Sequence, residues 1–371
     1  MNDDTVLFEE RGTASGHRLG VARLNRPRQL NALTLQMCQL MLDKLRAWSS
    51  DQGIVAVLIE GAGEKGFCAG GDVAEVIRNV RAGGPQRFVY GDAFFAVEYQ
   101  LDYLLHTYPK PLIAYSHGVC MGGGVGLAVG ARHRFVADGS RIAMPEIHIG
   151  LFPDVGGGWF LNRLPGAAGT VMALTGMIVN EADALFAGLA DYFVPLEARD
   201  TLNERLLALD WSGDAARDDE AVTRLGLSLH RKFKMGLPTS NLQQYFDAIR
   251  FIGSQPTVIA VRDALRAAAD EDPFFRGPAD NLAQGSPTAA QITFEYLRRS
   301  RHLSLREVLE LDLVLARNCQ RGGDFGEGVR ALLIDKDRKP AWLPARFEDV
   351  GAAHVAAFFR ADGVSFTTAQ A

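Results

Sequence analysis

Two carboxylates, Glu146 and Asp154, stand eight residues apart in the otherwise largely apolar segment 143–158. Two prolines and four glycines interrupt this segment, so we expect a shaped loop and not a regular helix. Acids in apolar surroundings lose hydration, which raises their pKa and suits them to general acid–base catalysis. The competing interpretation for Asp154 is that its side chain caps the helix that follows.

Two glycine-rich segments, residues 67–72 and 117–127, each follow an apolar run and precede a helical pattern. Glycine lets the backbone approach a ligand closely, and the N–H groups at the start of a helix favour a negative charge. Two such turns after neighbouring strands would aim two N–H donors at one oxygen, which is the arrangement of an oxyanion hole. The competing interpretation is a pair of tight turns that bind nothing.

Two further motifs imitate other enzyme classes. Residues 61–66 match the GxGxxG spacing of dinucleotide sites, but residues 67–72 separate them from the next helical pattern, whereas a dinucleotide turn opens directly into its helix. Ser116 approaches the GxSxG spacing of serine hydrolases, but the first glycine is missing and more loop follows. The histidines that such a hydrolase would need have no distinctive context: His230, His302 and His354. We therefore interpret Ser116 as a strand-end residue and keep a serine thioesterase as a rival.

The elements that must position these residues change in type along the chain. Apolar β-branched runs predict strands, and apolar residues at spacings of three and four predict helices. After about residue 195 the patterns are all amphipathic helices, and pairs of glycine and proline separate them: Gly236–Pro238, Gly277–Pro278 and Gly285–Pro287. We expect an α/β core in residues 1–200 and a helical region in residues 201–371. In the core we expect strands at 5–12, 17–25, 54–61 and 110–118, and helices at 33–51 and 93–109.

Composition excludes several classes of function. The chain has 371 residues and a formal net charge of −5, which argues against nucleic acid as the main partner. The basic stretch 229–234 is expected to be a solvated helix face, and RNA binding is its alternative interpretation. The four cysteines lack the spacing of zinc sites or disulfide frameworks. With no apolar run of ~18 residues and no signal-like or transit-like start, we expect no membrane span and a cytoplasmic location.

Together these segments resemble the crotonase (enoyl-CoA hydratase/isomerase) superfamily. The resemblance implies a spiral of ββα units with a helical C-terminal region, and an acyl-CoA thioester as substrate. It also implies an oxyanion hole made by the backbone N–H groups of Gly71 and Gly123, with Glu146 as the catalytic carboxylate. The segments that carry it are Asn25-Arg26-Pro27, Asn31-Ala32-Leu33, Phe67–Asp72, Gly118–Gly124, Pro145-Glu146-Ile147, Gly150 and Gly156-Gly157.

One departure separates branches of that superfamily. Hydratases carry a second glutamate where this chain has Gly126, and hydration needs two acids that flank the double bond. Dienoyl-CoA isomerases are a closer rival, because they have a carboxylate pair spaced like Glu146 and Asp154. They carry an aspartate where this chain has Gly126, however, and lack a long helical extension. Dienoyl-CoA isomerase, enoyl-CoA isomerase and enoyl-CoA hydratase activities remain alternatives. Further segments match one branch of the superfamily: Met121–Leu127, Met144–Glu146, Gly150–Gly158, Ser286-Pro287-Thr288, Ser304-Leu305, Glu307-Val308-Leu309, Arg321-Gly322, Asp324-Phe325, Glu327–Ala331 and Leu333–Asp337. The chain is most similar there to the 3-hydroxyisobutyryl-CoA hydrolase branch.

That branch implies hydrolysis of 3-hydroxyisobutyryl-CoA to 3-hydroxyisobutyrate and CoA, as in valine catabolism. Glu146 would activate water or attack the thioester carbon itself, and Asp154 would hold the 3-hydroxyl group or the water. The resemblance makes Glu98 a substrate contact, although the helical pattern alone predicts an ordinary polar position there. No metal or redox cofactor is expected, because coenzyme A is part of the substrate. A homo-oligomer is left open, since the superfamily often forms trimers and the helical region could cover that surface.

Overall fold

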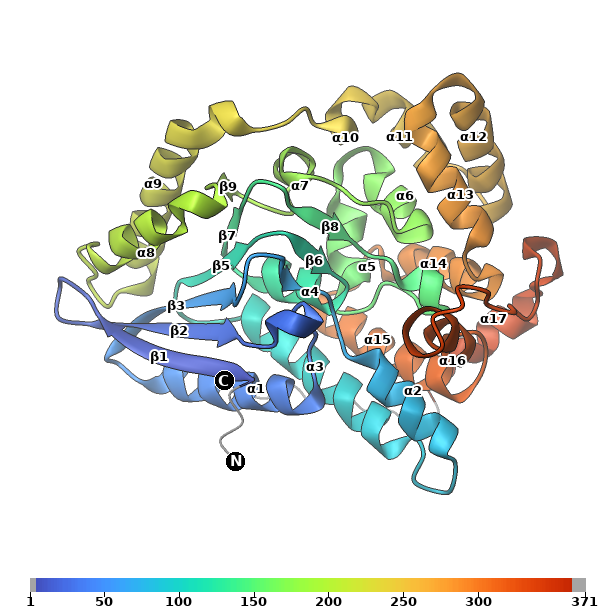
Figure 1. The fold of residues 1–371 in the computed structure, drawn as a ribbon, viewed down its shortest axis with the longest axis horizontal. Coiled ribbons are helices and arrows are strands. Elements are labelled where there is room, and N and C mark those ends of the chain that lie inside the picture. Colours follow the sequence, from blue (N-terminus) through green and yellow to red (C-terminus); the bar gives the residue numbers. More distant parts are fainter. Residues whose placement is uncertain (1–4, 362–371) are drawn as a thin grey trace.

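The computed structural model describes residues 5–361, which form two β-sheets surrounded by helices (Figure 1). The main sheet has the order β1-β2-β3-β5-β7-β9; β1 and β2 are antiparallel, and the other neighbours are parallel. The α/β class with its parallel sheet is therefore confirmed. The strands of this sheet are β1 (Val6–Gly12), β2 (Arg18–Leu24), β3 (Ile54–Gly61), β5 (Leu112–Ser116), β7 (His133–Val136) and β9 (Tyr192–Phe193).

Strand β3 shows why the sheet is buried on both faces. Successive side chains of a strand point to opposite faces of the sheet. All eight residues of β3 are buried, so both faces of the sheet are covered at this strand. Val57 and Ile59 join the core between the sheet and helices α1 (Leu35–Ser50) and α3 (Val89–His106). Ala56 and Leu58 join a second apolar cluster on the opposite face.

A second, three-stranded parallel sheet carries the glycine-rich turns. Its order is β4 (Gly66–Cys68), β6 (Val119–Met121) and β8 (Arg141–Ala143). A strand of the main sheet, a strand of this small sheet and a helix follow one another in turn. This order occurs in β3-β4-α2, where α2 is Val73–Ala82, and in β5-β6-α4, where α4 is Gly123–Gly130. Both glycine-rich turns therefore leave neighbouring strands of the small sheet at the same edge.

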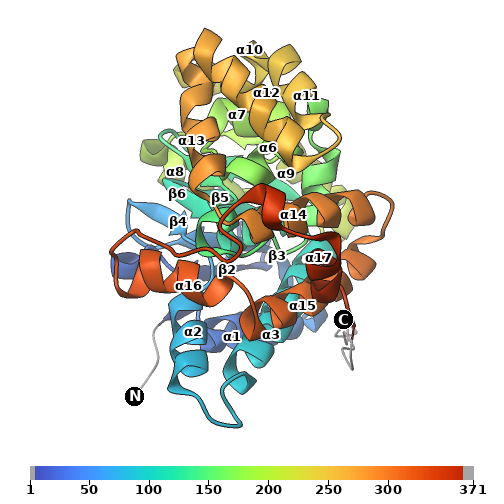
Figure 2. The ribbon, with the colours of Figure 1, turned by 90° about the vertical axis from the view of Figure 1, so that its right-hand side faces the viewer.

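The second half of the described chain is helical, as the sequence predicts. In Figure 1 helices α10–α17, coloured yellow to red, gather on one side of the α/β part, and in Figure 2 they face the viewer. The remaining helices are α2 (Val73–Ala82), α4 (Gly123–Gly130), α5 (Gly157–Phe160), α6 (Ala168–Thr175), α7 (Glu181–Ala187), α8 (Arg199–Leu207), α9 (Ala215–Phe233), α10 (Asn241–Gln244), α11 (Phe246–Gly253), α12 (Val258–Glu271), α13 (Arg276–Gln284), α14 (Pro287–Ser300), α15 (Leu305–Arg321), α16 (Phe325–Val329) and α17 (Ala352–Phe358).

One helix agrees with the sequence expectation and another departs from it. Helix α9 packs Val222, Leu225 and Leu229 onto the second apolar cluster. The cations at its end, Arg231, Lys232 and Lys234, are exposed, so the interpretation of the basic stretch as a solvated face is confirmed. Helix α13 contains Gly277 and Pro278, whereas the sequence predicts that these two residues separate helices. Proline is tolerated there because it stands in the first turn, where its missing N–H would have no intrahelical partner.

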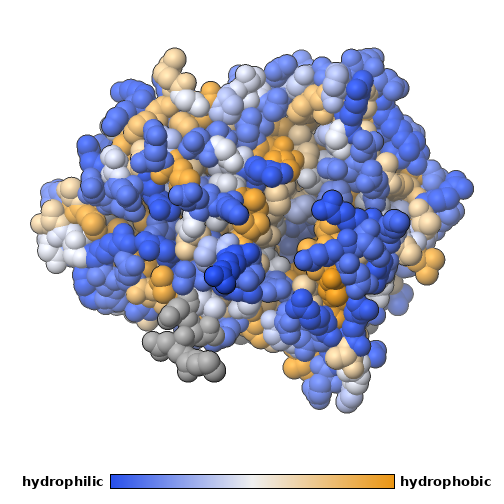
Figure 3. Space-filling view, in the orientation of Figure 1, coloured by the Kyte–Doolittle hydropathy of each residue, from blue (hydrophilic) through white to orange (hydrophobic). Residues whose placement is uncertain are grey.

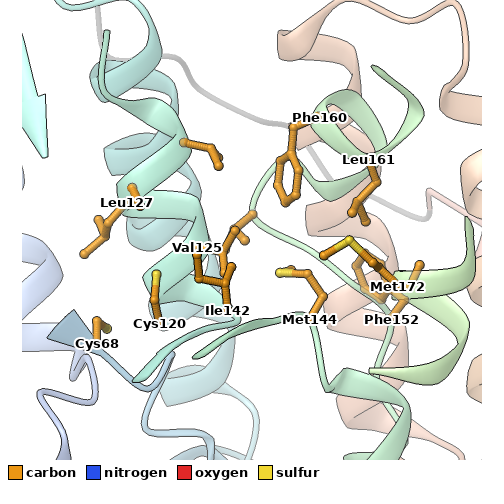
Figure 4. Packing of buried hydrophobic residues seen from close by; sticks show 14 of the residues in the cluster. Cys68, Cys120, Val125, Leu127, Ile142, Met144, Phe152, Phe160, Leu161 and Met172 are labelled. Atoms are coloured by element: carbon orange, nitrogen blue, oxygen red, sulfur yellow. The ribbon is translucent and has the colours of Figure 1, made fainter. Parts of the chain in front are cut away.

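The main hydrophobic core is continuous from the sheet to the C-terminal helices. A single cluster of buried side chains includes residues from Val6 of β1 to Phe358 of α17. Figure 4 shows part of this core, where Cys120, Val125 and Ile142 gather between α4 and the small sheet. The proposed division of the chain at residue 200 stays a prediction.

Candidate active site

A cavity of about 710 Å³ opens between the small sheet and the C-terminal helices. Its walls come from both glycine-rich turns, the loop from Pro145 to Asp154, helix α3 and residues 331–342 of the C-terminal region. In Figure 3 apolar surface gathers in a hollow near the middle of the face, between hydrophilic rims. All five residues predicted for the site line this cavity: Gly71, Glu98, Gly123, Glu146 and Asp154.

The two glycine-rich turns bring Gly71 and Gly123 together. Gly123 is the first residue of α4, and the first N–H groups of a helix have no intrahelical partner. A Cβ atom placed on Gly123 would lie 3.5 Å from the backbone nitrogen of Gly71. Gly122 adopts φ +51°, a left-handed conformation that favours glycine and that turns the chain sharply into α4. The two amides therefore border one small space, as an oxyanion hole requires.

Glu98 faces that space from helix α3. Its side chain is only 3% exposed, so the ordinary polar position that the helical pattern predicts is wrong. Its Oε1 atom would lie 2.5 Å from a Cβ on Gly123 and 3.6 Å from a Cβ on Gly71. This oxygen has no hydrogen-bond partner among the described residues, and a buried polar atom of that kind is costly unless a ligand satisfies it.

Glu146 and Asp154 reach the cavity from the loop after β8. Glu146 begins the short 3₁₀ helix η2 (Glu146–Ile149), and its Oε1 would lie 2.9 Å from a Cβ on Gly122. Asp154 accepts a hydrogen bond of 2.7 Å from the hydroxyl of Tyr99 on α3. Its side chain makes no capping hydrogen bond to α5, so the capping interpretation is wrong.

Burial of several acids in one place changes their titration. Burial raises the pKa of Glu146 well above its ordinary range, and the Asp154 carboxylate raises it further. Burial, with Asp154 and Glu146, does the same to Glu98. Burial also raises the pKa of Asp154 from 3.8 to about 6, against the opposing hydrogen bond from Tyr99. Like charges this close do not all ionise at neutral pH, so the site holds both proton donors and proton acceptors.

At Gly126, where hydratases carry their second acid, other side chains fill the space that such an acid would need. A Cβ on Gly126 would lie 2.8 Å from Cβ of Val155 and 3.1 Å from Oδ1 of Asp102, so a glutamate side chain does not fit there. Asp102 follows Glu98 by one helical turn on α3, and neither of its carboxylate oxygens has a partner among the described residues. Asp102 does not line the cavity, so it does not replace the missing acid.

The C-terminal helices hold the loop that carries Asp154. The backbone N–H of Gly156 donates to Oδ2 of Asp312 on α15 over 2.8 Å. The N–H of Gly158 donates to the hydroxyl of Tyr296 on α14 over 2.7 Å, and that hydroxyl donates to Asp312. Loop and helices thus form one hydrogen-bonded unit, and the loop depends on residues far along the chain.

The other motifs take no part in this cavity. Ser116 is buried, and its hydroxyl donates to the backbone oxygen of Phe135, so it is not an exposed nucleophile. The GxGxxG segment runs from β3 into β4, with no helix directly after it. Between residues 5 and 361 no cluster of three or more histidine, cysteine or acidic side chains is arranged to hold a metal ion.

Sequence reasoning missed Tyr99, Asp102, Tyr296 and Asp312. A signal exists for Asp102, because the buried positions of α3 recur at spacings of three and four and both acids fall in the same stripe: Phe94, Glu98, Leu101, Asp102 and Leu105. Tyr296 and Asp312 carry no such local signal, since the loop residues that they bind, Gly158 and Gly156, lie more than a hundred residues away.

Comparison with known proteins identifies relatives over nearly the whole chain. The model of the family described as enoyl-CoA hydratase/isomerase matches residues 19–359. A protein named 3-hydroxyisobutyryl-CoA hydrolase, mitochondrial, from Rattus norvegicus is 40% identical over 359 residues, covering 96% of this chain and 89% of the relative. Its counterpart from Homo sapiens is 38% identical over 348 residues, covering 94% and 86%.

Solved structures share the fold across the C-terminal region as well. A carnitinyl-CoA dehydratase from Mycobacterium thermoresistibile superposes with a TM-score of 0.86 at 34% identity, covering 99% of both chains. An enoyl-CoA hydratase from Rhodobacter sphaeroides gives a TM-score of 0.83 at 36% identity, covering 96% of this chain and 97% of the other.

Proposed function

The chain belongs to the enoyl-CoA hydratase/isomerase family, and from this premise we propose that it hydrolyses 3-hydroxyisobutyryl-CoA to 3-hydroxyisobutyrate and CoA. The near-full-length likeness to 3-hydroxyisobutyryl-CoA hydrolases supports this thioesterase activity. The observation in the structure that carries the proposal is the site of Gly126. Because Val155 and Asp102 fill the space of a second acid, the cavity lacks the acid pair of a hydratase at this place.

In the proposed reaction the thioester oxygen accepts hydrogen bonds from the N–H groups of Gly71 and Gly123. These donors stabilise the negative charge that develops on that oxygen when the carbonyl carbon is attacked. Glu146 either takes a proton from the attacking water or attacks the carbon itself to form an anhydride, which water then opens. In both routes the C–S bond breaks, and the CoA thiolate leaves and takes up a proton.

Asp154 and Glu98 have different proposed roles, because their surroundings differ. Asp154 in its ionised form accepts a hydrogen bond from the substrate's 3-hydroxyl or from the water, while Tyr99 donates to its other side. Glu98 lies against the oxyanion hole, where a negative charge would oppose the reaction. We therefore assign it the protonated form, which donates a hydrogen bond to the substrate.

The test is free-thiol release from 3-hydroxyisobutyryl-CoA by the purified protein, with the absorbance of crotonyl-CoA followed in parallel. Thiol release without loss of the crotonyl signal is the expected result. Loss of the crotonyl signal without thiol release would establish the second candidate, a hydratase, which the names of the two similar solved structures favour.

The pH profile tests the role of Asp154. Asp154 is required in its ionised form, and burial raises its pKa to about 6. Glu146 must also be ionised, and burial raises its pKa as well, so kcat/KM should fall as the pH drops, with an acidic limb at about pH 6 or above. The hydrogen bond from Tyr99 lowers this pKa, so Tyr99→Phe should move the acidic limb to higher pH. Tyr108→Phe removes another partly buried hydroxyl, which donates to the backbone of Leu45, and serves as the control. An acidic limb that Tyr99→Phe leaves in place would contradict the role.

The remaining predictions concern context. The proposed reaction uses no metal or redox cofactor, and coenzyme A enters as part of the substrate. Every helix in the described part of the chain is too short or too polar to cross a bilayer. A cytoplasmic location stays a prediction, and the relatives from Rattus norvegicus and Homo sapiens are named as mitochondrial proteins. The substrate in those names supports a role in valine breakdown. Whether the chain forms a homo-oligomer is an open question.

A further inference from the structure

The outer wall of the cavity is a strap, residues 330–342, between α16 and the C-terminal helix. Six of its residues line the cavity: Ala331, Leu332, Leu333, Arg338, Pro340 and Trp342. Leu332 and Leu333 are each 38% exposed, whereas the three acids at the opposite wall are 3–5% exposed. The difference in exposed fraction therefore gives the cavity a direction. The carboxylates and the two glycine amides lie at its bottom, and the strap lies at its mouth.

The strap is fixed in place by ionic and polar contacts. The guanidinium of Arg330 donates to carboxylates of Glu327, Asp335 and Asp337 at distances of 2.6 to 2.9 Å. At the other end, the indole N–H of Trp342 donates to the backbone oxygen of Gln284 over 2.9 Å. Asp335 and Asp337, the acids of the strap, are therefore paired with Arg330, which does not line the cavity.

Arg338 is held toward the cavity by an unusual backbone. Its φ is +56°, a left-handed conformation that costs a non-glycine residue roughly 1 kcal/mol or more. The turn is closed by the N–H of Arg338, which donates to the backbone oxygen of Ala331 over 3.0 Å. Strain of this kind persists where the surrounding structure imposes it, and it recurs at ligand clamps.

Charge makes Arg338 distinct among the residues that line the cavity. It carries the single permanently positive side chain among the lining residues that the structure describes. Within residues 5–361 its guanidinium makes no ion pair, because Asp335 and Asp337 are engaged by Arg330. An exposed strap with an unpaired guanidinium at the mouth of the cavity is complementary to a ligand whose reacting group is buried and whose far end is anionic.

We propose that Arg338 binds the phosphate groups of the CoA thioester, while Leu332 and Leu333 contact its pantetheine arm. This assignment rests on the proposed function, because that function supplies a substrate with a thioester at one end and phosphates at the other. The guanidinium fork matches phosphate oxygens and donates charge-assisted hydrogen bonds to them. Arg338 is then a binding residue that acts on affinity and leaves the chemical step unchanged.

The experiment compares two substrates that differ in phosphate. One is 3-hydroxyisobutyryl-CoA; the other is the same acyl group on pantetheine, which keeps the thioester and lacks every phosphate. For Arg338→Gln we expect KM of the CoA ester to rise about tenfold, the lower range for a charge-assisted hydrogen bond, with kcat unchanged. KM of the pantetheine ester should equal that of the wild type. Lys339→Gln is the control, because Lys339 is the adjacent cation and does not line the cavity.

A binding measurement separates this inference from the proposed function. Calorimetric titration with free CoA and free pantetheine needs no turnover, and Arg338→Gln should weaken the binding of CoA alone. If the wild type releases no thiol but this selective weakening occurs, the hydrolase proposal fails and the role of Arg338 stands. If thiol is released normally and Arg338→Gln affects both ligands equally, or neither, the role of Arg338 is overturned.

Discussion

Glu146→Gln is expected to lower kcat for thiol release about a thousandfold, within the range for loss of a general base, and to leave KM within a few-fold. The change keeps the shape of the side chain and removes its ability to take a proton or to attack the thioester. The carboxyl lies against the Gly122 turn, where a glutamine has the same space. Initial rates of thiol release over a range of substrate concentrations measure both constants.

A matched control for this variant is Glu181→Gln. Glu181 is also a buried glutamate, 5% exposed, but it does not line the cavity, and it accepts a hydrogen bond from the N–H of Gly139. Loss of activity in both variants would indicate general damage to the fold. Near-normal turnover of Glu146→Gln would show that another group attacks or activates water, and the catalytic assignment would be wrong.

Gly123→Ala is expected to lower kcat about a hundredfold or more, the range for the loss of one oxyanion-hole donor. The added methyl group would lie 2.5 Å from Oε1 of Glu98 and 3.5 Å from the nitrogen of Gly71. It would therefore occupy the space that the thioester oxygen must enter. Glu98 can rotate away to relieve the contact, so the fold should persist while the oxyanion site is blocked.

The control for this variant is Gly12→Ala, since a methyl group on Gly12 meets no heavy atom within 4 Å. Thermal unfolding of both variants should match the wild type within a few degrees. Full activity of Gly123→Ala would mean that the thioester oxygen lies elsewhere, and the oxyanion hole would have to be sought at other amides of the two turns.

Local patterns were sufficient for the frame of the site. The β-branched run of β3 and the glycine-rich turns after β4 and β6 can be read from neighbouring residues, because strand and turn formation depend on short-range sequence. The loop of Glu146 and Asp154 could be predicted for the same reason. The prediction that Gly277 and Pro278 separate helices was wrong, because the position of a proline within a helix decides whether the proline breaks that helix.

Local patterns could not predict which residues far apart in the sequence lie close together in the fold. Nothing near Asp312 in the sequence indicates that its carboxylate binds the N–H of Gly156, or that it joins Tyr296 behind the loop that carries Asp154. The burial of Glu98 and Asp102 likewise depends on what packs against α3 and not on α3 alone. A stripe that mixes acids with phenylalanine and leucine is the one local sign that such acids are buried.

The bond between Gly156 and Asp312 also sets an order of events during protein synthesis. The two partners are 156 residues apart, so a ribosome adding ~5–20 residues per second makes Asp312 roughly 8 to 30 s after Gly156. During that interval the nascent loop has neither Asp312 nor Tyr296 to hold it. A chain released early would carry both glycine-rich turns and Glu146 without the two side chains that hold the loop of Asp154 in place.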